Sequence, residues 1–172
     1  MTGLAQAKEE AENAGTGRGG KYLTFTMANE AYGINILKIK EIIGMMQITM
    51  VPQTPDYIKG VINLRGKVIP VIDLRLRFGM EAMEYTERTC IIVIKIEGYE
   101  GVILTGIVVD SVSEVLNIKD REIEDTPTFG VDLISECLLG IAKMERGVKI
   151  LLDINRVLKG DEIKKLEKAT VT

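Results

Sequence analysis

The stretch GVINLRGKVIPVIDLRLRF, residues 60–78, decides the fold, because it contains two β-prone runs on either side of the dipeptide Arg65-Gly66. A second stretch, GIAKMERGVKILLDINRVL, residues 140–158, follows the same plan. Each begins with glycine, carries an Arg-Gly turn, and has an aspartate after its second apolar run. The sequence therefore predicts two β-hairpins of one kind.

A second repeat links YGINILKIKEII, residues 32–43, with TGIVVDSVSEVL, residues 105–116. When the two stretches are aligned, Gly33 corresponds to Gly106 and Glu41 corresponds to Glu114. One copy of either unit is too small to be stable alone, which favours two lobes that each combine strands of both kinds. We expect the first strand pair to join the last hairpin, because that brings both chain ends onto one lobe. Chance similarity between short β-rich segments is the alternative.

The repeats predict a mainly β fold in two lobes, with short helices between them and at the C-terminus. Lobe 1 is expected at about 21–44 plus 135–160, and lobe 2 at about 45–120. Residues 1–20 are expected to form a flexible tail, because they offer little apolar surface to bury. Asn35 is expected to cap a helix over about 36–43. A last helix over about 161–168 and a tail to residue 172 close the chain.

Composition excludes several classes of function. The 172 residues carry 22 Lys and Arg against 25 Asp and Glu, a formal net charge of −3, and no histidine. A slightly acidic chain with few aromatic residues argues against a nucleic-acid partner. Without histidine, neither a Ser-His-Asp or Cys-His nucleophile system nor a His-ligated zinc site can form.

Cysteines and hydropathy indicate the compartment. Cys90 and Cys137 lie far apart and in no CxxC spacing, so free thiols in a reducing cytoplasm are favoured over a disulfide. The N-terminal residues are polar, and no apolar run approaches the roughly 20 residues that span a bilayer. We expect a cytoplasmic protein without direct membrane insertion.

Two aspartates occupy matching places in the repeated hairpins. Asp73 and Asp153 each follow a strand, and as a pair they could perform acid–base chemistry or bind a metal. Capping of the next helical turn is the favoured interpretation, because aspartate is common at that position. No cofactor is expected.

Apolar residues in one segment exceed what a small core needs. Ile36, Ile39, Ile42 and Ile43 recur at three- and four-residue steps and would share one helix face, which is either core or a docking surface. Met45, Met46, Ile48, Met50 and Val51 follow, and methionine is common on binding surfaces. Together with the lack of a catalytic set, this pattern favours a protein-binding module.

Three motifs carry a family resemblance: YGINILKI from Tyr32, KGVINLRGKVIPVIDLR from Lys59 and GIVVDSVSEVL from Gly106. In order and over residues 21–160, the chain resembles the CheW family of bacterial chemotaxis coupling proteins. The same module occurs in the kinase CheA and in CheV, but this chain has no room for their further domains. The resemblance implies two intertwined five-stranded SH3-like β-barrels without enzymatic activity.

The resemblance also implies partners: the regulatory domain of the histidine kinase CheA and the cytoplasmic tip of chemoreceptors, in arrays at the membrane. The receptor-binding groove between the barrels would hold Leu23, Ile36, Ile39, Ile42, Arg65, Val112 and Val115. Kinase contacts are expected at Ile48, Met50 and Val51. Arg65, matched with Arg146 in the repeat, is expected to donate hydrogen bonds to the receptor rather than to stabilise the fold.

Three alternatives remain open. A CheW-like scaffold could serve a different receptor–kinase pathway, and only its partners would distinguish it. A small-molecule or oligonucleotide-binding barrel would need a basic or aromatic stripe that the sequence lacks. An enzyme is the least favoured class.

Overall fold

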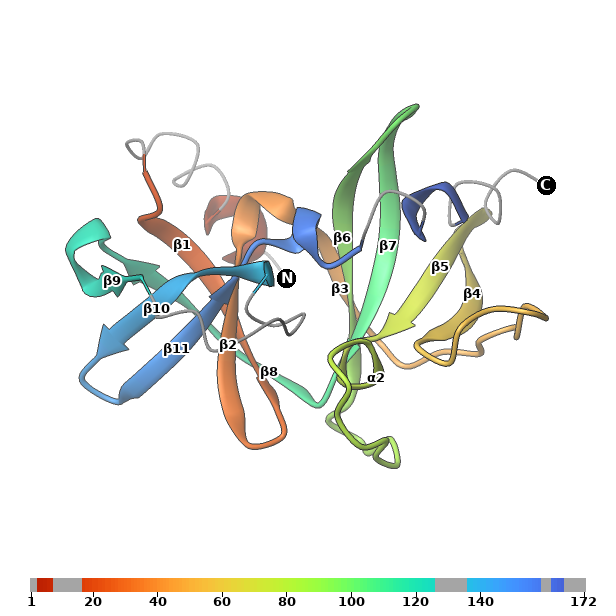
Figure 1. Ribbon diagram of the computed structural model, residues 1–172, viewed down its shortest axis with the longest axis horizontal. Helices are drawn as coiled ribbons and strands as arrows, with labels where there is room; N and C mark the ends of the chain where they lie inside the picture. The colour runs from red at the N-terminus through yellow and green to blue at the C-terminus, as the bar shows by residue number, and fades with distance from the viewer. Residues whose placement is uncertain (1–2, 8–16, 126–135, 159–161, 166–172) are drawn as a thin grey trace.

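The computed structural model describes residues 3–7, 17–125, 136–158 and 162–165. Two β-sheets lie side by side (Figure 1). The first sheet has the order β8-β1-β2-β11-β10-β9, with bounds β1 Gly20–Met27, β2 Glu30–Asn35, β8 Ser111–Ile118, β9 Ile123–Glu124, β10 Leu138–Met144 and β11 Gly147–Leu152. The second has the order β3-β6-β7-β5-β4, with bounds β3 Ile39–Gly44, β4 Ile58–Leu64, β5 Lys67–Asp73, β6 Cys90–Gly98 and β7 Gly101–Val109. We call them the first and second lobes.

The predicted pairing of the repeats is confirmed. In the first lobe the hairpin β1–β2 joins β10–β11 through the parallel pair β2–β11. In the second, β6–β7 joins β4–β5 through the parallel pair β5–β7. Gly33 and Gly106 lie at these parallel contacts, where an added Cβ would come within 2.9 Å of Leu151 and 2.7 Å of Ile91. Leu151 belongs to β11 and Ile91 to β6, so both positions are too crowded for a side chain, but the crowding comes from different neighbouring strands.

The lobes exchange strands, which the expected lobe bounds miss. Residues 39–44 pair with β6 of the second lobe, although the predicted range of lobe 1, which ended at about residue 44, included them. Residues 111–118 pair with β1 of the first lobe, although the bound at 120 placed them in lobe 2. The fold is mainly β, as predicted, but the first sheet has six strands rather than five. The edge strands are β8 and β9 in the first sheet and β3 and β4 in the second.

One apolar core spans both lobes. Its buried members come from the first sheet, such as Phe25 and Ile34, and from the second, such as Ile92 and Ile107. Each lobe adds a smaller cluster of its own, around Tyr22 in the first and around Ile91 in the second. Burial at the shared core supplies most of the attraction between the lobes.

The helix predicted over 36–43 is wrong beyond its first turn. Only Ile36–Lys38 forms a 3₁₀ helix (η1), and Asn35 caps it as expected, with its Oδ1 accepting a 2.9 Å hydrogen bond from the Leu37 N–H. From Ile39 the chain is a strand because its isoleucines pair with the isoleucines of β6. β-Branched side chains favour that pleated environment over a helix.

The two aspartates cap helical turns, as predicted. Asp73 caps α2 (Leu74–Arg77) by accepting from the Leu76 N–H at 3.3 Å. Asp153 caps the 3₁₀ turn η3 (Ile154–Arg156) by accepting from the Asn155 N–H at 3.1 Å. A further 3₁₀ turn, η2, covers Asp120–Glu122.

The described parts of residues 1–20 are more ordered than the predicted flexible tail. Residues 3–7 are helical, and Leu4 packs against the shared core. The Gly19 N–H donates to the Asp120 carboxylate, and Arg18 pairs with Asp125. Residues 162–165 are helical; the rest of the predicted last helix lies outside the described residues. In the described part of the chain, no helix is long and apolar enough to cross a membrane.

Candidate functional site

An open hollow of about 720 Å³ lies where the two lobes meet. Its walls come from β1 and β8 of the first lobe and from β3 and the start of β6 in the second. The lining residues are Thr26, Ile42, Ile43, Gly44, Arg88, Cys90, Ser111, Val112 and Ser113. The exchanged strands β3 and β8 therefore place opposite walls of one site.

Ile42 and Val112 are the two predicted groove residues that line this hollow. Ile42 lies on β3 and Val112 on β8, so they come from different lobes. Both are half-buried and pack against the shared core from either side. Their exposed parts give the hollow apolar walls, while Thr26, Ser111 and Ser113 add hydroxyl groups.

Three predicted contact residues are core residues instead. Leu23, Ile36 and Ile39 are 2%, 0% and 0% exposed, so in this fold they present no surface to a partner. The prediction placed Ile36, Ile39 and Ile42 on one helix face. Instead, Ile36 is buried in the 3₁₀ turn η1, and Ile39 is buried in strand β3, where it pairs with Ile94.

Val115 lies on the same strand as Val112 but outside the hollow's lining, and it is 38% exposed. The register shifts by one residue between the pairs Phe25–Val112 and Leu23–Val115. Directly opposed residues share a face of a sheet, so this bulge brings both valines to the same face. Val115 therefore extends the β8 wall along the strand.

Arg65 lies in the turn between β4 and β5 and forms an ion pair with Glu41 of β3. It does not line the hollow. The strand register also shows which residue of the second hairpin is equivalent to Arg65. Leu64 pairs with Lys67 in the first hairpin and Met144 with Gly147 in the second, so Glu145 is the residue equivalent to Arg65. The match with Arg146 was wrong by one residue.

The segment expected to contact the kinase is exposed mainly at one side chain. Met50 is 81% exposed, whereas Ile48 and Val51 are half-buried. A β-bridge between Thr49 and Val61 fixes the segment on β4, with backbone hydrogen bonds of 2.8 Å in both directions. Val51 lines a separate small hollow with Pro55, Ile58 and other residues.

The hollow's ionisable groups are suited to binding rather than to covalent chemistry. Burial raises the pKa of the Cys90 thiol, so the thiol stays protonated at neutral pH and is a poor nucleophile. Among the described residues, no three His, Cys, Asp or Glu side chains are grouped to hold a metal ion. Apolar walls with a few hydroxyl groups and Arg88 at the rim are typical of a protein-docking surface.

Sequence reasoning missed two features of the site. Arg88 and Cys90 line the hollow, but Arg88 lies in a loop without a pattern, and the apolar run that begins at Cys90 predicts a strand without indicating a site. An ion pair between Arg75 and Asp110 lies beside the hollow, and the two residues are 35 positions apart. Asp110 could have been noticed, since it immediately precedes the lining residues 111–113.

Comparisons with known proteins agree on one family. The family model described as "CheW-like domain" matches residues 21–162. A protein of Klebsiella aerogenes named "Chemotaxis protein CheW" is 42% identical over 163 residues, which cover 95% of this chain and 94% of that protein. One of Bacillus subtilis with the same name is 36% identical and covers 81% and 87%. The crystal structure of the scaffolding protein TtCheW from Thermoanaerobacter tengcongensis matches with a TM-score of 0.74 at 35% identity, over 84% of this chain and 97% of that one.

Proposed function

The chain belongs to the CheW family of non-enzymatic chemotaxis scaffold proteins, and from that premise we propose that it couples chemoreceptors to the histidine kinase CheA. In this proposal it works in the cytoplasm and is recruited to receptor arrays at the membrane. The relatives' names, which include "Chemotaxis protein CheW" and "scaffolding protein TtCheW", support a scaffold role in chemotaxis.

The observation that carries the proposal is the hollow between the lobes. Ile42 from one wall and Val112 from the other leave an apolar cleft, whose sides are fixed by strands that the lobes exchange. Such a cleft suits an amphipathic receptor helix, which inserts apolar side chains at helical spacing. Val115 prolongs one wall, and the ion pair of Arg65 with Glu41, which directly precedes Ile42 in β3, supplies charged groups near the other.

The kinase surface is proposed elsewhere, at Met50 with Ile48 and Val51. Met50 stands out from the surface while the bridge to β4 holds its backbone in place. An exposed, unbranched side chain on a fixed backbone is suited to filling an apolar depression on a partner. This segment is not part of the hollow's lining, so the proposal assigns the two partners separate surfaces.

The direct test is co-sedimentation of three purified components: membranes that contain a chemoreceptor, CheA, and this protein. The expected result is that CheA sediments with the membranes only when this protein is present. A further control replaces the receptor membranes with receptor-free membranes, which should retain neither protein. CheA recruitment that does not depend on this protein would contradict the proposal.

A further inference from the structure

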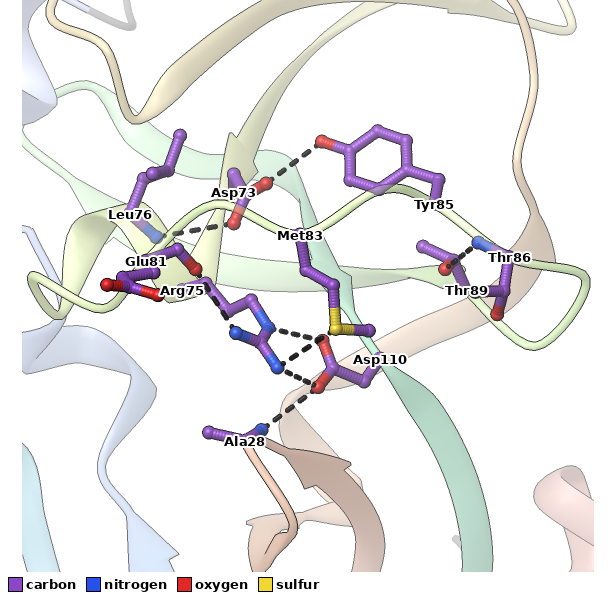
Figure 2. A network of polar contacts seen from close by, with 10 residues as sticks. All are labelled: Ala28, Asp73, Arg75, Leu76, Glu81, Met83, Tyr85, Thr86, Thr89 and Asp110. Atoms are coloured by element: carbon purple, nitrogen blue, oxygen red, sulfur yellow. Dashed lines mark hydrogen bonds and ion pairs between the residues drawn. The ribbon is translucent and has the colours of Figure 1, made fainter.

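Asp110 lies between β7 of the second lobe and β8 of the first, where the chain crosses from one lobe to the other. Its carboxylate accepts two hydrogen bonds from Arg75, from Nε to Oδ1 and from Nη2 to Oδ2, each 2.8 Å long (Figure 2). Two parallel hydrogen bonds of this kind fix both distance and orientation. Arg75 belongs to α2 of the second lobe.

The same carboxylate also binds the first lobe. Oδ2 accepts a 2.9 Å hydrogen bond from the Ala28 N–H in the turn between β1 and β2. The Asp110 N–H in turn donates to the Thr26 carbonyl at 3.1 Å. Figure 2 shows Asp110 between Arg75 on one side and Ala28 on the other. One side chain therefore joins α2, the interlobe crossing and the first hairpin.

The backbone at Ala28 belongs to a tight hairpin turn. Ala28 and Asn29 have φ values of +50° and +66°, as a two-residue loop between antiparallel strands requires. The Ala28 N–H of this turn is the group that donates to the Asp110 carboxylate.

The network extends to the rim of the hollow. Arg75 donates to the Glu81 carbonyl at 3.1 Å and to the Met83 sulfur at 3.3 Å, and Tyr85 donates to Asp73 at 2.9 Å. These bonds hold the loop between α2 and β6, which leads to Arg88 and Cys90 in the hollow's lining. On the other wall, residues 111–113 directly follow Asp110.

Burial and charge make the pair effective. The side chains of Arg75 and Asp110 are 15% and 17% exposed, so solvent screens them only in part. The hydrogen bonds from Arg75 hold the pKa of the Asp110 carboxyl below its ordinary value, and the same contact raises the pKa of Arg75. Both groups are therefore charged at neutral pH.

We propose that Arg75 and Asp110 are positioning residues that fix the two walls of the interlobe hollow relative to each other, and so preset it for its helical partner. The proposal rests on the proposed receptor-binding function of the hollow. It does not require either residue to touch the partner. The shared core keeps the lobes together; the ion pair sets their relative orientation.

The chain offers a matched control at the pseudo-equivalent position. Asn155 follows its capping aspartate, Asp153, by two residues, as Arg75 follows Asp73. Its Oδ1 accepts one hydrogen bond, 3.3 Å long, from the Glu97 N–H of the other lobe. Asn155 thus also links the lobes, but through a single neutral bond away from the hollow.

The test measures lobe orientation and partner affinity on the full-length protein. Residual dipolar couplings of backbone amides are recorded for wild type, Asp110→Asn, Arg75→Lys and Asn155→Ala. Affinity for a soluble receptor fragment that contains the cytoplasmic tip is measured for the same four proteins. A fit of the couplings of one lobe to the structure of that lobe alone reports whether the lobe is still folded.

In wild type and in Asn155→Ala, we expect one alignment tensor to fit both lobes. In Asp110→Asn, separate tensors are needed, and receptor affinity falls roughly tenfold, because only about a tenth of the molecules then hold the lobes in the binding orientation. Arg75→Lys should lie between these, since lysine keeps the charge but not the two-pronged geometry. This intermediate behaviour separates positioning from simple stability.

A single tensor together with wild-type affinity in Asp110→Asn would overturn the proposal. Separate tensors with wild-type affinity would overturn it too, because the hollow would then not depend on lobe orientation. If wild type itself does not bind the receptor fragment, the proposed function fails at that step. The dipolar couplings still decide in that case whether the pair orients the lobes.

Discussion

The two lobes repeat one strand plan but are tied to each other by unlike side chains at matching positions. Two residues beyond the first capping aspartate, Arg75 makes two charged hydrogen bonds to Asp110. Two residues beyond the second, Asn155 accepts one bond of 3.3 Å. The strand plan is shared, but two charge-assisted hydrogen bonds fix distance and orientation where a single neutral bond does not, so we expect one side of the interlobe contact to be stiffer than the other. The stiffer side is the one beside the hollow.

A second contrast concerns the exchanged strands. In the repeat, Ile39 of β3 matches Val112 of β8, and each pairs with the equivalent residue of a neighbouring strand. Ile39 is fully buried, whereas Val112 is half-buried and lines the hollow. Equivalent positions thus serve the core in one copy and the wall of the hollow in the other.

The largest expected effect tests this second contrast. Ile39→Asp should prevent folding, because it places a charge without a partner in the core at a cost of several kcal/mol. Val112→Asp should remain folded and lose binding to the receptor fragment. Urea unfolding followed by circular dichroism measures the first effect, and fluorescence anisotropy the second. A folded Ile39→Asp protein that has lost only receptor binding would mean that Ile39 contacts the receptor and is not a core residue.

Alanine substitutions compare the two side-chain contacts between the lobes, Arg75–Asp110 and Asn155–Glu97. Arg75→Ala should lower the free energy of unfolding by about 2 kcal/mol, because it leaves a mostly buried carboxylate without its charged partner. Asn155→Ala should cost no more than about 0.5 kcal/mol, as expected for one long neutral hydrogen bond. Chemical denaturation of both variants measures the difference. Equal decreases in the free energy of unfolding would mean that the two contacts stabilise the protein equally.

The hairpin turns provide a third comparison. Arg65→Ala and Glu145→Ala should each change the free energy of unfolding by no more than about 0.5 kcal/mol, because both lie in exposed turns. Only Arg65→Ala should weaken receptor binding and kinase activation, and Arg65→Lys should restore them in part, since lysine lacks the planar donor fork. Kinase activation by Arg65→Ala at the wild-type level would remove Arg65 from the site.

The smallest effect is a dependence on pH. The folded state lowers the pKa of Asp110, so its contribution to stability is complete above the ordinary carboxyl pKa of about 4. That contribution is lost as the pH falls through the lowered value. The stability difference between wild type and Asp110→Asn should therefore be constant from pH 5 to 7 and shrink in acid, as urea titrations at each pH would show. A difference that grows in acid would contradict the assignment.

Particular residues show how far the sequence could predict the fold. The matched repeats predicted two lobes that each combine a strand pair with a hairpin of the same kind, and the parallel contacts β2–β11 and β5–β7 confirm that pairing. The prediction of a helix over residues 36–43 was wrong for a local reason. A β-bulge between Ile39 and Glu41 inserts one residue, so isoleucines three apart share a face of a strand, as they would on a helix.

The candidate site was less predictable because its contacts are distant in sequence. Ile42 and Val112 were expected in one groove from the repeat and the family resemblance, and the structure brings them to one hollow. The pairs Arg65–Glu41 and Arg75–Asp110 could not be predicted, since no local pattern links residues 24 and 35 positions apart. Long-range ion pairs depend on how the strands are exchanged, which hydrophobic periodicity does not specify.

The central claim is that this chain joins two partners through two separate surfaces. The most direct measurement titrates the receptor fragment and the CheA regulatory domain, each alone, into wild type, Ile42→Asp and Met50→Glu by calorimetry. Val148→Asp, a change at an exposed strand position of the first lobe, serves as the matched control. We predict that Ile42→Asp loses the receptor fragment but binds the kinase domain like wild type, and that Met50→Glu shows the reverse. Loss of both partners in either folded variant, or of neither, would contradict the account.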